Sequence, residues 1–251
     1  MNPEDKEICR KLLRQRRLAI SAAERARRAE GICRLLVARA CQLRLRRGRS
    51  KAPGRGAFKL AIFLPLPEEP NLWPAWSTLN SLGFSLYAPR VLPAGQLGWA
   101  PLPSQLFKSF FRAKLARSET AAVKVEGGVP ISSNKQLLFR DPTGLLLEKK
   151  LKASGWAVSS YGILEPPETA CCTSVQPHLI FLPCLGVDLN GVRMGYGGGY
   201  YDRFLSQIKA REKQKKGTAR AVKVAVCYRE QVVEVLPKAP WDESVDAVIS
   251  G

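Results

Sequence analysis

Residues 193–203 read Arg-Met-Gly-Tyr-Gly-Gly-Gly-Tyr-Tyr-Asp-Arg and follow the apolar run His-Leu-Ile-Phe-Leu-Pro at 178–183. Four glycines within five positions let the backbone approach a ligand closely and turn its N–H groups inward, which suits a phosphate. Phe204 and Leu205 then indicate a helix, whose N-terminus favours anions. This succession of strand, glycine loop and helix predicts an α/β unit that binds an anion.

The side chains around the glycines extend this hypothesis. Asp202 falls in the first turn of the helix, where a carboxylate is stabilised and can hold a divalent cation beside phosphates. Tyr200 and Tyr201 offer flat faces that suit a planar heterocycle. The loop has neither the Gly-Lys-Ser/Thr ending of a P-loop nor a G-x-G-x-x-G pattern placed directly between strand and helix. On the glycines alone, a flexible loop followed by a buried tyrosine pair is the competing interpretation.

Further elements alternate along the chain in the manner of an α/β domain with a largely parallel sheet. Ligands in such sheets bind outside the carboxyl ends of the strands. Glu68 and Glu69 follow one strand end and the glycine loop follows another, so we expect both to reach one crevice. The predicted strands are 60–64, 85–91, 178–182, 222–228 and 246–250, and the predicted helices are 5–20, 21 to about 40, 71–82 and 200–209.

The first helix is predicted to be amphipathic. Its basic stripe is either a solvated face or a phosphate clamp, in which Lys6 and Arg10 lie one turn apart and grip one group together. The sequence Ser21-Ala22-Ala23-Glu24 is a capping box that starts the second helix. At 100° per residue the apolar side holds Ile8, Cys9, Leu12, Leu13 and Ile20, and the stripe holds Lys6, Arg10, Arg14 and Arg17.

Length and composition favour one folded domain over residues 1–251, of which 45% are hydrophobic. No apolar run has transmembrane length and the N-terminus lacks a signal-peptide segment, so we expect a cytoplasmic protein without a membrane partner. Seven scattered cysteines without a C-x-x-C pair indicate neither a zinc site nor a disulfide framework. The single histidine, His178, lies in a predicted apolar strand. We therefore expect neither a histidine-based metal site nor a Cys–His catalytic pair.

The net charge of +19 suits either nucleic acid or polyanionic small molecules. Two of the basic runs, the segment 43–57 and residues 209–216, are predicted to be exposed loops. The segment from about 104 to 158 mixes basic, serine-rich and apolar pieces and is predicted to be an insertion on the domain surface. Nucleic acid is the less favoured partner, because no clustered aromatics of the kind that stack bases are found.

Taken together, the motifs resemble the 5-formyltetrahydrofolate cyclo-ligase (5,10-methenyltetrahydrofolate synthetase) family. The resemblance covers nearly the whole chain apart from the insertion and the basic loops, and the glycine string is its most specific part. It implies a three-layer α/β sandwich, with a mainly parallel sheet between helices and the active site at the strand carboxyl ends. In chain order the motifs are Lys6-x-x-x-Arg10 with Arg14 and Arg17, Leu64-Pro65-Leu66-Pro67-Glu68-Glu69, Pro89-Arg90-Val91, Gly162–Pro166, Leu182-Pro183, Val187-Asp188, Gly191–Arg203, Gln231, Leu236-Pro237 and Asp242-x-x-x-Asp246.

The resemblance also implies a reaction. Enzymes of the family use ATP and Mg²⁺ to convert 5-formyltetrahydrofolate into 5,10-methenyltetrahydrofolate, with release of ADP and phosphate. The formyl oxygen attacks the γ-phosphate, and N10 then attacks the activated carbon as phosphate leaves. Phosphorylation turns a poor leaving group into a good one, so the protein supplies mainly positioning and charge neutralisation.

Site residues are implied in the same way. Lys6, Arg10, Arg193 and Tyr200 would take part in catalysis, and Asp202 with Asp242 would carry Mg²⁺. Arg90 and Glu165 match motifs, although a structural strand-end role is an equal alternative. ATP would be bound by Lys6, Arg10, Arg193, Met194, Gly195, Tyr196, Gly197, Gly198, Gly199, Tyr200 and Tyr201, and the folate, with or without a polyglutamate tail, by Leu64, Glu69, Tyr196, Gly197, Gly198, Gly199 and Tyr200.

The chain departs from the family pattern at the insertion, at His178 in place of a usual acidic residue, and at Trp241 in place of a common histidine. None of these positions is assigned to ATP or metal, so an active enzyme, expected as a monomer, is the leading hypothesis. The alternatives are a catalytically diverged member that binds nucleic acid through its basic surface, and a kinase-like enzyme acting on another formylated or carboxylated substrate.

Overall fold

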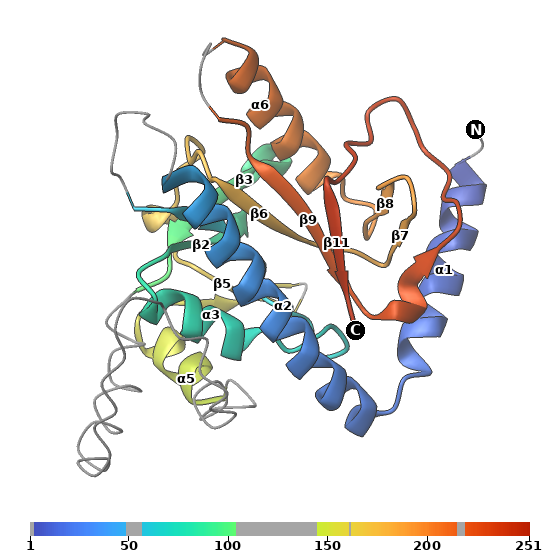
Figure 1. Ribbon diagram of the computed structural model, residues 1–251, viewed down its shortest axis with the longest axis horizontal. Helices are drawn as coiled ribbons and strands as arrows, with labels where there is room; N and C mark the ends of the chain where they lie inside the picture. Colours follow the sequence, from blue (N-terminus) through green and yellow to red (C-terminus); the bar gives the residue numbers. More distant parts are fainter. Residues whose placement is uncertain (1–2, 49–56, 104–144, 161, 215–218) are drawn as a thin grey trace.

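We describe a computed structural model of the chain that covers residues 3–48, 57–103, 145–160, 162–214 and 219–251 (Figure 1). Within these ranges, no helix is both long and apolar enough to cross a membrane. The elements are α1 Pro3–Leu18, α2 Ala22–Gly48, β1 Lys59–Ala61, α3 Trp73–Ser81, β2 Ser85–Val91, η1 Pro93–Gly95, β3 Leu97–Pro101, α5 Leu145–Ala153, β4 Ala157–Val158, β5 Leu164–Glu165, η2 Glu168–Ala170, β6 Leu179–Pro183, β7 Gly186–Asp188, β8 Arg193–Met194, α6 Tyr200–Gln214, β9 Val222–Cys227, η3 Arg229–Gln231, β10 Val232–Val233 and β11 Ala247–Ser250.

The main sheet has the strand order β11-β9-β6-β1-β2-β3. Its first five strands run parallel to their neighbours, and β3 pairs with β2 in the antiparallel direction. Two smaller sheets, β10-β7-β8 and β4-β5, lie outside it. The prediction of a mainly parallel sheet is therefore confirmed.

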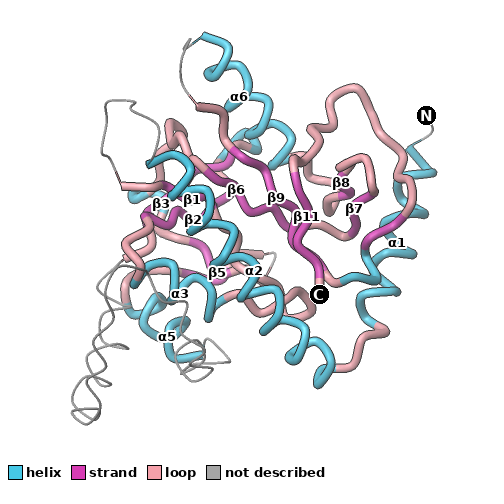
Figure 2. Tube along the Cα trace, viewed as in Figure 1, coloured by secondary structure: helices cyan, strands magenta, loops and turns pink. Residues whose placement is uncertain are grey.

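Helices cover both faces of this sheet (Figure 2). Successive residues of β6 point to opposite faces, so Leu179 and Phe181 enter one apolar cluster while Ile180 and Leu182 enter another. The first cluster is completed by side chains of α2, α3 and α5, and the second by α6 through residues such as Phe204. This arrangement is the expected three-layer sandwich.

Helix α1 packs against the small sheet rather than the main one, and its faces differ from the prediction. Leu13 and Ile20 are buried, but Ile8 and Leu12 are 59% and 52% exposed. Arg17, predicted to lie on the basic stripe, is completely buried. The helix contacts the rest of the fold through a narrow apolar seam beside β7 and β8. A helical period alone therefore overestimates how much of its apolar side is covered.

The two basic segments predicted as loops are partly helical. Residues 43–48 form the end of α2 and residues 209–214 the end of α6. The prediction is wrong there because Arg and Lys are good helix formers, so a basic run does not end a helix. The remainder of both segments, at 49–56 and 215–218, lies outside the described residues.

The predicted insertion needs a similar correction. Residues 104–144 lie outside the described part of the chain. The end of the segment, however, forms α5 and β4, and Leu151 and Trp156 are buried in the main apolar cluster. Residues that fill the core belong to the domain itself and not to a surface addition.

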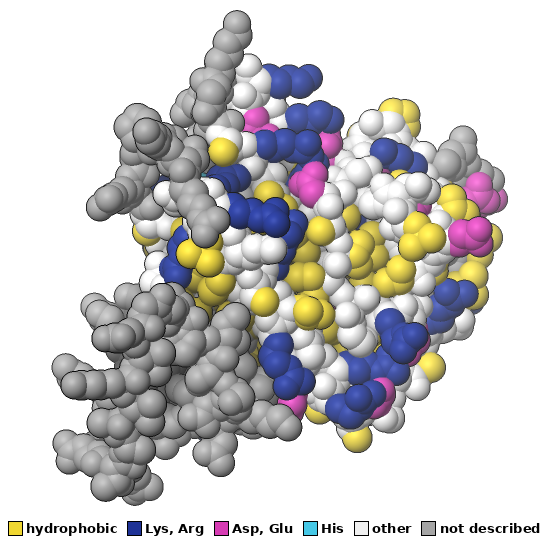
Figure 3. All heavy atoms as spheres, viewed as in Figure 1, with side chains coloured by type: hydrophobic (Ala, Val, Ile, Leu, Met, Phe, Trp, Pro, Cys, Tyr) yellow, Lys and Arg dark blue, Asp and Glu magenta, His cyan; other side chains and the backbone are white. Residues whose placement is uncertain are grey.

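Basic side chains occur in several places on the surface (Figure 3). Several of them lie beside carboxylates, so the charge of these particular side chains is locally compensated while the net charge of +19 remains. Ion pairs of this kind join Arg27 to Glu24, Arg28 to Glu24 and Glu230, Lys209 to Glu243, and Arg220 to Asp246.

Asp188 closes the turn that follows β7. Its Oδ1 accepts hydrogen bonds from the backbone N–H groups of Asn190 (2.9 Å) and Val192 (2.8 Å), and its Oδ2 accepts one from Leu236 (3.0 Å). The residue is 2% exposed, and its hydrogen bonds from Val192 and Leu236 are buried. One carboxylate thus joins the hairpin under α1 to the chain that follows β10.

We expect Asp188→Ala to lower the free energy of unfolding by about 3 kcal/mol, because it leaves buried N–H groups without an acceptor. Urea denaturation followed by tryptophan fluorescence measures the change. Glu234→Ala, at an exposed position of the same region, serves as the control and is expected to be nearly neutral. Equal destabilisation by the two substitutions would contradict this role of Asp188.

Candidate active site

A cavity of about 1200 Å³ opens at the carboxyl ends of the central strands. Its floor is formed where β1, β2 and β6 end, and α1, the glycine loop and the segment 239–242 surround it. The geometry confirms that Glu69 and the glycine loop reach one crevice. Every residue predicted for the site lines this cavity, namely Lys6, Arg10, Leu64, Glu69, Arg193, Met194, Gly195, Tyr196, Gly197, Gly198, Gly199, Tyr200, Tyr201, Asp202 and Asp242.

The glycine loop has a backbone conformation that would be strained for residues other than glycine. Gly197 and Gly199 have positive φ angles of 109° and 64°. A Cβ atom on Gly198 would lie 2.4 Å from Cε2 of Tyr200. The Arg203 guanidinium fixes the loop from outside, donating from Nη2 to the carbonyl oxygens of Gly198 (2.9 Å) and Gly95 (2.8 Å). These contacts define the shape of the loop, for which the glycines alone favour a flexible segment.

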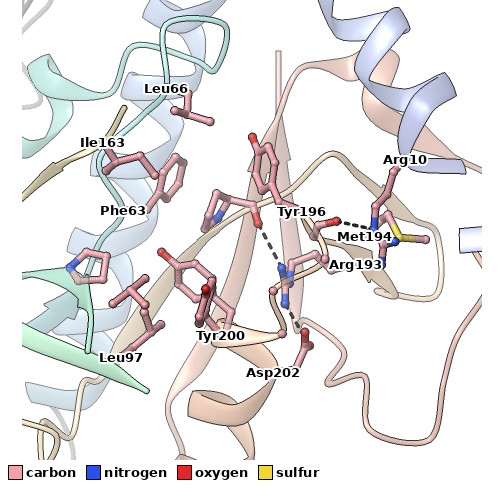
Figure 4. Close-up of a pocket in the computed structure, with 18 of the residues that line it drawn as sticks. Arg10, Phe63, Leu66, Leu97, Ile163, Arg193, Met194, Tyr196, Tyr200 and Asp202 are labelled. Carbon is pink, nitrogen blue, oxygen red and sulfur yellow. Dashed lines mark hydrogen bonds and ion pairs between the residues drawn. The ribbon is translucent and has the colours of Figure 1, made fainter. Parts of the chain in front are cut away.

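Two cations and two carboxylates are paired at one side of the cavity. Arg193, almost completely buried, donates from Nη2 to Oδ1 of Asp202 at 3.0 Å (Figure 4). Lys6 Nζ lies 2.5 Å from Oδ2 of Asp242. The backbone N–H of Glu243 also donates to Oδ1 of Asp202 (3.3 Å), which brings the segment 239–243 beside the start of α6. Asp202 and Asp242 are thus each paired with one cation.

The two carboxylates have the chemistry that Mg²⁺ requires. This ion takes oxygen ligands and is commonly held by one or two carboxylates together with substrate phosphates. Among the described residues, no group of three or more His, Cys, Asp or Glu side chains could hold a metal ion. If Asp202 and Asp242 held such an ion, phosphate and water would have to supply its other ligands.

Asp246, whose spacing supported Asp242 in the sequence, serves another purpose. Its carboxylate pairs with Arg220 (2.6 Å) and accepts the backbone N–H of Lys223 (2.8 Å) at the start of β9. It does not line the cavity. Of the two aspartates in the motif, only Asp242 therefore lies at the cavity.

A buried polar cluster behind the opposite wall was missed by the sequence reasoning. Tyr196 Oη donates to Oε1 of Glu69, and Arg17 Nη1 lies 2.5 Å from the same tyrosine oxygen. Arg17 also donates from Nη2 to Oε1 of Glu68 at 2.8 Å. Burial raises the pKa of the Glu69 carboxyl, while hydrogen bonds from Tyr196 and the backbone N–H of Leu66 act in the opposite direction.

The remaining wall is apolar. Phe63, Leu97 and Ile163 project into the cavity opposite the glycine loop (Figure 4). Sequence reasoning did not select these three residues, although each lies in or beside a motif or strand end. The wall is suited to a flat, partly apolar ligand.

Glu165 and Arg90 both have structural contacts. Glu165 lines the cavity and accepts the backbone N–H of Val91 at 3.4 Å, while burial raises the pKa of its carboxyl. Arg90 does not line the cavity and donates to the carbonyl oxygen of Pro166 (2.8 Å). For Arg90 the strand-end alternative agrees with the geometry.

Comparison with known proteins adds independent information. Residues 136–251 match the sequence model of the 5-formyltetrahydrofolate cyclo-ligase family. The chain is 29% identical over 110 residues to a probable 5-formyltetrahydrofolate cyclo-ligase of Schizosaccharomyces pombe, which covers 39% of this chain and 51% of that protein. It is 33% identical over 99 residues to the 5-formyltetrahydrofolate cyclo-ligase of Mus musculus, covering 39% and 46%. The matches thus span about half the length of these relatives.

Solved structures extend the similarity of fold to the whole chain. The 5,10-methenyltetrahydrofolate synthetase of Aquifex aeolicus superposes with a TM-score of 0.56 and 23% identity, covering 98% of this chain and 89% of that one. The enzyme of that name from Mycoplasma pneumoniae gives a TM-score of 0.53 at 17% identity and covers 98% of both chains. The fold is shared throughout, and residues 136–251 are similar in sequence to the 5-formyltetrahydrofolate cyclo-ligase family.

Proposed function

We propose that this protein is an ATP- and Mg²⁺-dependent 5-formyltetrahydrofolate cyclo-ligase that forms 5,10-methenyltetrahydrofolate, ADP and phosphate. The observation that carries the proposal is the composition of one cavity. It has a glycine loop, cations and carboxylates on one side, and an apolar wall with a buried glutamate on the other. Such a cavity suits a phosphorylated nucleotide beside a flat organic substrate.

The charged side would bind the phosphates of ATP. Arg10 lines the cavity and its Nε donates to the carbonyl oxygen of Gly195 (3.3 Å), so its guanidinium lies against the glycine loop. Lys6 lies one helical turn from Arg10, and Arg193 precedes the glycine loop in the chain. All three cations line the cavity. Asp202 and Asp242 would hold Mg²⁺, which when bound would neutralise charge on the phosphates.

The apolar side would bind the folate. Leu64 belongs to this wall and Glu69 offers a carboxylate to the amine-rich edge of the pterin. With the formyl oxygen held beside the γ-phosphate, the protein would favour the in-line approach of these two groups. ADP then leaves, N10 attacks the activated carbon, and phosphate leaves as the ring closes. Positioning and charge neutralisation account for this chemistry without a covalent enzyme intermediate.

The direct test is absorbance at the methenyl-folate band after mixing the protein with 5-formyltetrahydrofolate, ATP and Mg²⁺. We expect product when all three are present and none when any one is omitted. ATP binding without product would contradict the proposed substrate, and phosphate release with other formylated or carboxylated compounds would then identify a kinase-like activity. We also propose that the working form is a cytoplasmic monomer, which sedimentation and subcellular localisation would test.

A further inference from the structure

Arg17 is the most completely enclosed charged side chain among the described residues. Its side chain is 0% exposed, yet it comes from α1, whose other arginines are exposed or partly exposed. The guanidinium does not line the cavity. It lies behind the wall and contacts residues that do, from the segment after β1 and from the glycine loop. A charge that is costly to bury thus lies directly behind residues that line the cavity.

The contacts of Arg17 connect two walls of the cavity. Its Nη1 lies 2.5 Å from Tyr196 Oη and 3.7 Å from Glu69 Oε1, and its Nη2 lies 2.8 Å from Glu68 Oε1. The guanidinium also lies over the Tyr196 ring, with its Cζ 5.5 Å from the ring centroid. One planar group therefore fixes Tyr196 and Glu69 relative to each other.

The charge of Arg17 also bears on the protonation of Glu69. Burial favours the neutral carboxylic acid, and Glu68 acts in the same direction. Arg17, the Tyr196 hydroxyl and the Leu66 N–H favour the ionised form. Tyr201 and Tyr228 also face this cluster, and their own pKa values are raised by burial. Arg17 supplies the principal positive charge that opposes the protonation of Glu69.

From this geometry we infer that Arg17 is a positioning residue for substrate binding: through direct contacts it holds Tyr196 and Glu69 in place, so that the Glu69 carboxyl group is presented to the organic substrate. The inference rests on the proposed function, because it assigns Glu69 to the folate side. The effect is expected mainly on the organic substrate, because Arg17 contacts neither Lys6, Arg10 nor Arg193, although the resemblance implies Tyr196 for ATP as well.

The test compares Arg17→Met and Arg17→Lys with Arg16→Ala, an exposed neighbour on the same helix. We expect Arg17→Met to raise the KM for the folate by about 100-fold and Arg17→Lys by about tenfold, as for a lost hydrogen bond to a charged group. The KM for ATP is expected to stay within about twofold. The acidic limb of kcat/KM for the folate is expected to move to higher pH in Arg17→Met, because Glu69 ionises less readily without the cation.

A second measurement does not depend on turnover. NMR titration of the Glu69 carboxyl carbon, assigned with Glu69→Gln, is expected to show a higher pKa in Arg17→Met than in the unaltered protein. Where Arg17→Met does not fold, Arg17→Lys supplies the comparison. Equal increases of the KM for folate and ATP with an unmoved pH limb would overturn the inference, as would an unchanged Glu69 pKa. If the unaltered protein lacks activity but the Glu69 pKa moves as expected, the proposed substrate fails while the role of Arg17 in holding Glu69 stands.

Discussion

Replacing Asp202 by asparagine is expected to lower kcat for methenyl-folate formation by about a thousandfold, the loss typical of a removed electrostatic contact to a transition state. Asp202 lies in the first turn of α6 and lines the cavity beside Arg193. Asparagine has nearly the same shape but no charge, so it is a poor ligand for Mg²⁺. The fold should persist, because the side chain still accepts the N–H of Glu243.

The measurement is the methenyl-folate absorbance assay as a function of Mg²⁺ concentration. Glu243→Gln is the matched control, because this neighbouring carboxylate pairs with Lys209 and does not line the cavity. It is expected to retain nearly full activity. If both variants lost activity equally, general charge at this edge would explain the effect and the metal role of Asp202 would be wrong.

The same variant separates the enzyme from a nucleic-acid-binding protein. Asp202→Asn removes one negative charge inside the cavity, so affinity of the outer basic surface for nucleic acid should stay nearly the same. Loss of turnover with unchanged affinity in a filter-binding assay is the expected result. Loss of both together would show that the two activities share a site.

Gly198→Ala is expected to reduce kcat/KM for ATP by about a hundredfold while the protein remains folded. The added Cβ would lie 2.4 Å from Cε2 and 2.8 Å from Cδ2 of Tyr200. The Arg203 guanidinium lies over the tyrosine ring, with its Cζ 5.2 Å from the ring centroid, so a movement of the ring disturbs this contact. The loop or the ring must therefore shift, and both line the cavity.

Steady-state kinetics with ATP as the varied substrate measures this effect. Gly31→Ala is the control, because a Cβ there meets no atom within 4 Å and the residue lies inside α2. Helix propensity predicts that this control is stabilised by up to about 1 kcal/mol. Unchanged ATP kinetics in Gly198→Ala would refute the close fit between the loop and Tyr200.

Elements with a strong local pattern were predictable from the sequence. Strand β2 was predicted with the bounds found, at 85–91, and the helix after the glycine loop was predicted to begin at Tyr200. One half of the capping box at Ser21 is also formed, because its Oγ accepts the N–H of Glu24 at 3.2 Å, while the Glu24 carboxylate pairs with Arg27 and Arg28. These features depend on neighbours in the sequence, so a single chain suffices to find them.

The short strands β4, β5, β7, β8 and β10 were not predicted. Each has two or three residues, too few for an alternating pattern to emerge. Strand β1 was predicted to reach residue 64, but it ends at Ala61 because the chain then turns toward the cavity. Pairing partners far away in the sequence decide these bounds.

The candidate site likewise has a part that the sequence predicts and a part that it does not. The glycine loop and Asp202 were found because their composition is unusual over a few residues. Arg17 was misplaced, because helical periodicity puts it on the basic stripe. Only its partners from two other segments, Glu68 and Tyr196, account for its burial. Site residues that lie within one segment can thus be predicted from the sequence, whereas contacts between distant segments can be identified only once the fold is known.

The ion pair of Lys6 with Asp242 has a consequence for the order of folding. These residues are 236 positions apart, so their contact closes one of the longest loops in the chain. Long-range contacts form late, since the entropy of the intervening chain must first be lost. A nascent chain on the ribosome that has folded its sheet up to β6 would still lack the wall formed by residues 239–242. The proposed phosphate side of the cavity is therefore completed only after residues 239–242 have been synthesised.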